Sequence, residues 1–492
     1  MSLLAIVLGG AAMPEETVLR PPEPPRAQEP ETEAGVGERA VPAESIGPSP
    51  GAPTISLAQA IALALERNYV LLTAGDSVAA ARFRETAARG EFLPKLTPRY
   101  QGGPAGPAFG LDASQRLPWT GGSVTAGATF RSLPADGSPA MKGAEVHAVV
   151  SQPLLRGAGP NATFFDLTNA TRSREGQERA FELARQRLAV DVAATFYQVV
   201  RQRELLAVSR QSLKRSESLR EASEARMKVG LASKLDVFRA ELQASQTEEA
   251  LVQSQAELDG ALEQFRILLG LDPGDPVEPE TVTLPDSVDL DLEPVEALVA
   301  RALDTRIELK EARDQVTDAE RAARLARQNL LPQLDFNVDF AQAGLGPTYS
   351  DSLRVGRGRV DVFLSTSYPL ERSSDQANRA IAEVDLAARR RALAQRELDV
   401  AGEVRAAVRN LDRIRKSADL QRKGVEFADQ QVRLATLRYQ RGLASNFDVV
   451  DAEGNLLSSR TALVGLLADH QVARIQLLRA LGTLDVTREF AP

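Results

Sequence analysis

The chain has 492 residues, of which 26% are charged and 5% aromatic, and its formal net charge is −8. Long stretches rich in Ala, Leu, Arg, Glu and Gln are typical of long helices and coiled coils. The acidic balance argues against nucleic-acid binding, because no basic patch stands clear of its acidic neighbours. The chain has no cysteine, which excludes disulfides and thiol chemistry. No run reaches the ~20 apolar residues of a membrane-spanning helix.

Two segments at the start of the chain differ from the rest in composition. Residues 1–12 have a short apolar core that ends in small residues, and they resemble a secretory signal without its basic region. A mis-assigned start or a disordered terminus are the alternatives. Residues 13–53 are rich in Pro and Glu and nearly free of aromatic residues. Such a segment cannot bury enough apolar surface to fold, so we expect a disordered tail.

Four short motifs occur twice, in the same order. The pairs are Phe-Leu-Pro94 with Leu-Leu-Pro332, Ser-Gln-Pro153 with Ser-Tyr-Pro369, Gly230-Leu-Ala-Ser-Lys-Leu-Asp236 with Gly442-Leu-Ala-Ser-Asn-Phe-Asp448, and Leu-Leu-Gly270 with Ala-Leu-Gly482. Recurrence of this kind indicates an internal duplication. We expect a first repeat at 54–273, a linker at 274–293, a second repeat at 294–485 and a C-terminal tail at 486–492.

Helical patterns dominate both repeats. In chain order they cover 54–90, about 70 residues ending at Val229, about 40 ending at Leu269, then 294–331, a long helix ending at Arg441 and a shorter one ending at Leu481. The long helices carry apolar residues at seven-residue spacing: Val192, Val199, Leu206 and Leu213 in the first repeat, and Leu411, Ala418, Val425, Val432 and Tyr439 in the second. This spacing predicts knobs-into-holes packing against neighbouring helices.

Between the first two helices of each repeat, apolar and polar residues alternate. Phe336, Val338 and Phe340 share one face of a strand, as do Val360, Val362 and Leu364, and as do Val146, Ala148 and Val150 opposite Glu145 and His147. Period-two alternation suits a half-buried sheet or a lipid-facing barrel with a wet interior. Two hairpins in one chain cannot close a barrel, so a barrel would have to be shared between protomers.

No catalytic constellation is visible in the sequence. His147 and His470 are far apart, and neither has a partner at the spacing of a metal ligand. None of the Gly pairs opens a helix after a hydrophobic strand, as a phosphate-binding loop would. We therefore expect no enzymatic activity, no cofactor and no metal site.

The duplicated Gly-Leu-Ala-Ser segment reads as a turn between two helices. Gly230 and Gly442 suit the left-handed position that ends a helix. Ser233 and Ser445 are natural N-caps of the next helix, with Asp236 and Asp448 three residues on to complete a capping box. Asp451 lies one turn after Asp448 on the same face and is not part of the capping box. Two carboxylates at this spacing repel by a few tenths of a kcal/mol, so Asp451 needs another explanation.

On these turns, and on the four prolines of the paired motifs, the chain resembles the TolC-like outer-membrane efflux family from about 54 to 485. The resemblance implies an α+β, mostly helical homotrimer in which each chain adds four strands to a twelve-stranded β-barrel in outer-membrane lipid. The helices would form a long periplasmic α-helical barrel. The implied function is a passive exit duct of a tripartite efflux or type I secretion system, joined to an inner-membrane transporter through a periplasmic adaptor (membrane fusion) protein.

The resemblance also implies roles for individual residues. Asp448 and Asp451 match the acidic ring at the periplasmic entrance, and Asp236 and Tyr439 match a network that keeps the entrance closed. The basic partner of that network falls at Ala444, so Arg441 and Lys234 are candidates to replace it. The helix-tip turns would meet the adaptor through Gly230, Leu231, Ser233, Gly442, Leu443 and Ser445. The first strand region, from Pro94 to Pro153, would carry an enlarged external loop.

An alternative interpretation is a periplasmic coiled-coil adaptor or scaffold without a membrane barrel. It accounts for the helices but leaves the alternating strands without a role. The sequence does not identify the cargo, because drugs, metal ions and secreted polypeptides could all use such a duct.

Overall fold

The computed structural model describes residues 53–103, 106–133, 140–280, 282, 284, 293–355 and 357–486. The predicted signal segment at 1–12, nearly all of the Pro/Glu-rich tail, part of the linker and all but the first residue of the C-terminal tail lie outside the described residues.

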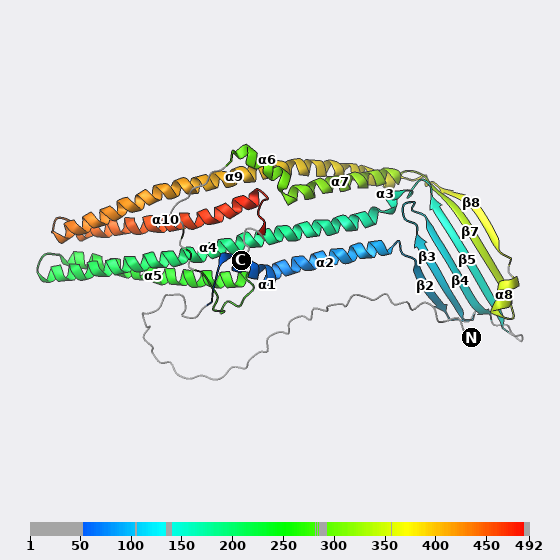
Figure 1. Cartoon of the computed structure of the whole chain (residues 1–492), viewed down its shortest axis with the longest axis horizontal. Helices are drawn as coiled ribbons and strands as arrows, with labels where there is room; N and C mark the ends of the chain where they lie inside the picture. Colours follow the sequence, from blue (N-terminus) through cyan, green and yellow to red (C-terminus); the bar gives the residue numbers. More distant parts are fainter. Residues whose placement is uncertain are drawn as a thin grey trace, which may run out of the picture. The chain divides into compact units, whose positions relative to one another are not determined.

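The duplication is visible in the helices (Figure 1). The first repeat has α1 (Leu57–Arg67), α2 (Tyr69–Gly90), α3 (Pro160–Thr163), α4 (Phe165–Lys228) and α5 (Lys234–Leu268). The second has α6 (Val295–Thr305), α7 (Ile307–Gln328), α8 (Tyr349–Val355), α9 (Ser373–Gln440) and α10 (Asn446–Ala480). Helices α1 and α6 both have 11 residues, α2 and α7 both 22, and α5 and α10 both 35. Within the described chain, none of these helices is both long and apolar enough to cross a membrane.

The first helix of each repeat is broken, where the sequence predicts one continuous helix. Asn68, with an extended backbone, separates α1 from α2, and its side-chain Oδ1 accepts hydrogen bonds from the backbone N–H groups of Val70 and Leu71. Arg306 holds the same place between α6 and α7. Asn is among the preferred N-cap residues, but the apolar periodicity continues across this position and does not reveal the break.

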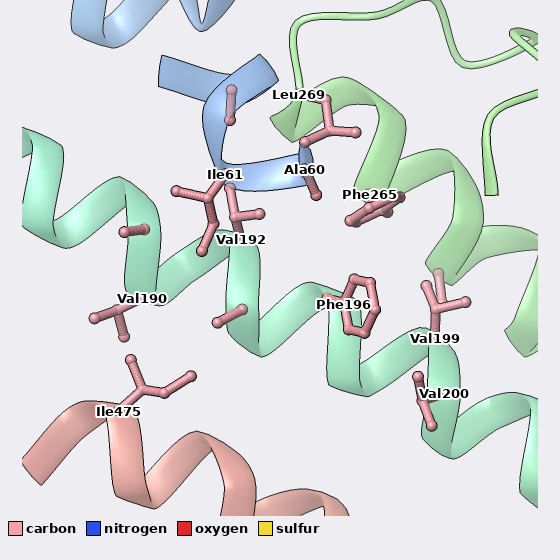
Figure 2. Packing of buried hydrophobic residues seen from close by; sticks show 14 of the residues in the cluster. Ala60, Ile61, Val190, Val192, Phe196, Val199, Val200, Phe265, Leu269 and Ile475 are labelled. Carbon is pink, nitrogen blue, oxygen red and sulfur yellow. The ribbon is translucent and has the colours of Figure 1, made fainter. Parts of the chain in front are cut away.

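The main apolar core forms around α4 (Figure 2). Val192, Phe196 and Val199 are fully buried on α4, together with Ile61 of α1 and Phe265 of α5. Members of α10, among them Ile475, belong to the same cluster and so join the second repeat to the first. The seven-residue spacing predicted for α4 is confirmed at Val192, Val199 and Leu206, which are buried, whereas Leu213 is half-buried. In α9 the predicted Leu411, Ala418, Val432 and Tyr439 are buried.

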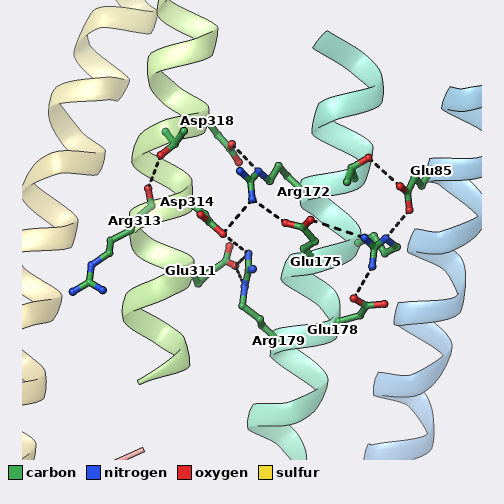
Figure 3. A network of polar contacts seen from close by, with 12 residues as sticks. Glu85, Arg172, Glu175, Glu178, Arg179, Glu311, Arg313, Asp314 and Asp318 are labelled. Atoms are coloured by element: carbon green, nitrogen blue, oxygen red, sulfur yellow. Dashed lines mark hydrogen bonds and ion pairs between the residues drawn. The ribbon is translucent and has the colours of Figure 1, made fainter. Parts of the chain in front are cut away.

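Nearer the start of α4, charged side chains make the contacts with its neighbours (Figure 3). Towards α2, Glu85 accepts hydrogen bonds from Arg174 Nε at 2.6 Å and Thr171 Oγ1 at 3.0 Å. Towards α7, Arg179 lies 2.6 Å from Glu311 and 3.1 Å from Asp314. Ion pairs therefore connect this part of α4 to helices of both repeats.

The strands between the helices form one antiparallel sheet of six, in the order β2-β3-β4-β5-β7-β8. They are β2 (Lys95–Gln101), β3 (Ala108–Arg116), β4 (Ser123–Leu133), β5 (Met141–Pro153), β7 (Gln333–Gly346) and β8 (Arg359–Ser367). A separate parallel pair joins β1 (Thr54–Ile55) to β6 (Glu278–Pro279). The sheet thus has six strands per chain, where the resemblance implies four. In the described part of the region from Pro94 to Pro153 the expected enlarged loop is replaced by a further hairpin.

The strand register places residues of like polarity on the same face. One row of paired residues runs through Thr97, Asp112, Gly127, His147, Ala341 and Arg359. Residues in this row and at every second position from it form the first face, which is mainly polar. The opposite face is mainly apolar, with Leu96, Tyr100, Phe109, Leu111, Val124, Phe130, Val146, Val150, Phe336, Val338, Phe340, Val360, Val362 and Leu364. The predicted face-sharing of the alternating residues is confirmed.

His470 of α10 lies in the helical core, where neither ring nitrogen has a hydrogen-bond partner among the described residues. Burial, aided by the nearby Arg474 guanidinium, lowers the pKa of this histidine, so the folded protein favours its neutral form.

We expect the protein to lose stability as the pH falls through about 6.5, the ordinary histidine pKa, because the unfolded chain binds a proton that the folded chain resists. His470→Leu should flatten this dependence. Denaturant unfolding of the purified protein between pH 8 and pH 5 measures the effect. Equal pH dependence in the variant and the wild type would contradict the prediction.

Candidate functional site at the paired helix turns

Both Gly-Leu-Ala-Ser turns have the same backbone geometry. Gly230 and Gly442 have φ values of +76° and +75°, the left-handed region that glycine enters without strain. The N–H of Gly230 bonds to Met227 O at 3.0 Å, and that of Leu231 to Arg226 O at 2.8 Å. The second turn repeats these bonds from Gly442 to Tyr439 and from Leu443 to Arg438. This is the Schellman ending of a helix, as the sequence predicted.

The capping boxes that follow are also confirmed. Asp236 Oδ2 accepts hydrogen bonds from Ser233 N at 3.0 Å and Ser233 Oγ at 2.7 Å. Asp448 Oδ2 accepts from Ser445 N at 2.8 Å and Ser445 Oγ at 3.0 Å. The bonds from the Ser233 side chain and backbone lower the pKa of Asp236, which keeps this carboxylate ionised. The Asp236 side chain is therefore engaged in its own turn, and among the described residues it does not bond Tyr439.

Tyr439 instead bonds across to the first repeat. Its hydroxyl lies 2.9 Å from Ser223 Oγ of α4, and both side chains are buried. Asn446, fully buried at the start of α10, donates through Nδ2 to Ser223 Oγ at 3.0 Å and to the Asp236 backbone carbonyl at 2.8 Å. These bonds join the α4–α5 pair to the α9–α10 pair beside the turns.

Arg226 is the basic residue of this cluster. Its Nη1 donates to the Tyr439 carbonyl at 2.5 Å, and its guanidinium carbon lies 4.7 Å from the centre of the Tyr439 ring. We call Ser223, Arg226, Tyr439 and Asn446 the inter-pair latch. Arg441 and Lys234, the candidates from the sequence, are exposed, and within the described chain neither side chain forms a hydrogen bond or ion pair with the latch.

A sequence signal for the latch lies outside the duplicated motifs and was missed. Ser209, Ser216 and Ser223 recur every seven residues along α4. The first bonds Ser254 at 3.0 Å and the second bonds Thr247 at 2.6 Å, both on α5, while the third bonds Tyr439. A heptad series of hydroxyls marks a polar row within the helix packing, although it does not identify the partners.

The two predicted ring residues lie near the second turn. Asp448 and Asp451 are both exposed on the first turns of α10. Asp448 is engaged in the capping box, whereas Asp451 accepts a long hydrogen bond from Asn455 Nδ2, at 3.3 Å. In the described protomer, therefore, the carboxylate of Asp448 caps a helix, whereas that of Asp451 does not.

Comparison with known proteins identifies the class. Residues 122–271 and 298–483 match the family described as "Outer membrane efflux protein". One matched segment lies in each repeat, and together they include both turns. The chain belongs to the outer membrane efflux protein family, a family of channels, and the protein lies in the outer membrane with its helical part in the periplasm.

Solved structures share the fold at low sequence identity. The chain is similar to CusC (19% identity, TM-score 0.67), with 87% of this chain and 92% of CusC covered. It is similar to VceC of Vibrio cholerae (18%, 0.67), with 87% and 96% covered. It is also similar to the open state of the MtrE channel of Neisseria gonorrhoeae (17%, 0.64), with 87% and 91% covered. No curated protein sequence matches the chain.

Arg226→Ala should loosen the turns, because it removes a charged hydrogen bond worth about 1.5–3 kcal/mol and a cation–π contact. We expect faster amide hydrogen exchange at residues 226–236 and 439–448. Arg220→Ala is the matched control, since Arg220 pairs within its own helix, with Glu224 at 2.8 Å. Equal exchange in both variants would mean that the latch does not hold the two helix pairs together.

Proposed function

We propose that this chain forms a homotrimeric duct through the outer membrane, which conducts substrates passively from the periplasm to the exterior. The observation that carries the proposal is the continuous apolar face of the sheet, opposite a mainly polar face, over all six strands. Strands that alternate in this way are typical of membrane barrels, with the apolar face in lipid and the polar face towards water.

Charged pairs on the polar face support this orientation. Arg99 and Asp112 form an ion pair there, and Asp112 Oδ1 lies 3.7 Å from His147 Nε2, above the space left by Gly127. Farther along the same face Arg131 and Glu145 lie 3.2 Å apart. Charged groups in lipid cost several kcal/mol, so this face is the one that lines the wet interior.

The helix turns supply the partner surface and the entrance. Leu231 and Leu443 are 69% and 74% exposed, which leaves an apolar surface at each of the two tips. They are the contacts we assign to a periplasmic adaptor, which would join the duct to an inner-membrane transporter in a tripartite efflux or type I secretion system. The inter-pair latch would hold the entrance closed, and its hydrogen bonds would break on opening.

Arginine substitutions at two neighbouring positions of β8 test the lipid-facing assignment. Val362 lies on the apolar face and Phe363 on the polar face, and both are exposed in the protomer. Val362→Arg should destabilise the folded barrel by about 2–4 kcal/mol, as arginine does near the centre of the lipid-facing side. Phe363→Arg should cost much less. Urea unfolding in lipid vesicles measures both, and equal costs would contradict the assignment.

Asp451→Ala tests the acidic entrance. In a trimer, Asp448 and Asp451 would place six carboxylates around one axis, and acidic rings favour cations. Single-channel recording in planar bilayers should show that Asp451→Ala loses cation selectivity and block by trivalent cations while the trimer stays intact. Asp448→Ala is informative beside it, because it should also cost ~1–2 kcal/mol of local helix stability by removing the capping box. An Asp451→Ala channel identical to the wild type would refute the ring.

A further inference from the structure

The first repeat contributes twice as many strands to the sheet as the second. Strand β2 follows α2 and β5 leads into α4, as the strands β7 and β8 follow α7 and lead into α9. The additional hairpin, β3–β4, lies between β2 and β5 and pairs with both along its length. All six strands therefore belong to one hydrogen-bonded sheet, whose edges are β2 and β8.

The turn between β3 and β4 is fixed at the helix end of the sheet. The Trp119 ring lies 5.2 Å from that of Phe164, which in turn lies 5.3 Å from Phe92. The Thr120 carbonyl accepts hydrogen bonds from Gly159 N at 3.2 Å and Gln152 Nε2 at 3.0 Å. Residues that precede β2 and residues at and after the end of β5 thus hold this turn in place, so the β3–β4 hairpin is a fixed part of the sheet.

The two edge strands are suited to pair with each other in neighbouring copies. Because β2 leaves a helix and β8 enters one, they run in opposite directions. In the part of the chain that the structure describes, each pairs on one side only. An exposed edge of this kind is a template for pairing with another chain. Pro98 of β2 has no N–H and so removes at most one bond from either ladder.

The stagger of the strands is that of a barrel. The row of paired residues from Thr97 to Arg359 crosses the sheet and gives a reference line. From this line to the helix-side end of the strand, β2 continues for two residues, to Lys95, and β8 for eight, to Ser367. The helix-side ends therefore shift by six residues over five steps between strands. A shift of six residues is about 20 Å along the strands, and five steps between strands are about 24 Å across the sheet. If the helix-side ends form the rim of a barrel, the strands are tilted by about 40° from the barrel axis. Strands of closed barrels tilt by 35–45°.

We infer that β8 of each protomer pairs antiparallel with β2 of a second copy of this chain, so that all six strands enter the barrel. The inference rests on the proposed trimer, in which three copies of the six-stranded sheet supply eighteen strands. Since barrel diameter grows roughly in proportion to strand number, this barrel is about one and a half times as wide as a twelve-stranded one.

Engineered disulfides test the inference in a chain that has no cysteine of its own. Thr97→Cys on β2 is combined in turn with Phe363→Cys, Ser365→Cys and Ser367→Cys on β8, which share its face and cover three registers. Directly opposed residues of antiparallel strands lie within disulfide range. The matched control is Thr125→Cys, the third residue of β4 as Thr97 is of β2, combined with the same three partners.

We expect one Thr97→Cys combination to give a covalent trimer on non-reducing gels that dithiothreitol returns to monomer, while every Thr125→Cys combination stays monomeric. Trimer formation is measured separately by light scattering of the detergent-solubilised variants. Trimers cross-linked through Thr125→Cys, or intact trimers cross-linked by neither set, would overturn the six-strand closure and leave the duct standing. Absence of any trimer would overturn the proposed function and the inference together.

Discussion

The apolar packing of α4 is the interaction on which the rest of the protein depends. Buried side chains of this helix meet α1 and α5 on one side, around Val192 and Phe196, and α10 on another, around Val190, so the helix joins parts of both repeats in one core (Figure 2). Water is excluded from this contact along several turns, and each buried side chain contributes about 1.5–3 kcal/mol. The ion pairs to α2 and α7, the turns at one end and the strand β5 at the other all take their positions from the same helix.

Much of the helical fold could be predicted from the sequence, because heptad spacing sustained over many turns is specific to long, packed helices. The breaks at Asn68 and Arg306 could not, since one residue with extended backbone hardly disturbs an apolar pattern. The strands β2 and β3 were missed for a related reason. Pro98 and the Gly102–Gly103 pair interrupt the alternation of Leu96, Tyr100 and Phe109, so the sequence of this segment is typical of a loop, and only its pairing with β4 makes it part of the sheet.

The candidate site divides in the same way. The glycines that end the helices and the serines that cap the next ones contact residues only three or four positions away. Such short-range contacts can be predicted from the sequence. The latch depends on Ser223 and Tyr439, which are 216 positions apart and meet only because the two helix pairs pack together. The basic residue that bonds Tyr439 is Arg226, which lies on a different helix from Ala444 and cannot be found by a comparison of positions.

The β3–β4 hairpin shows how a sheet of this kind can change in size. Neighbouring strands alternate in direction, so the two edges run antiparallel only when the number of strands is even. One additional strand would make the two edges parallel. The last strand before α4 would then end at the side of the sheet that is far from the helices. A hairpin is therefore the smallest insertion that preserves both the edges and the path into the helices. One repeat could in this way widen the sheet while its helices kept the lengths of their counterparts.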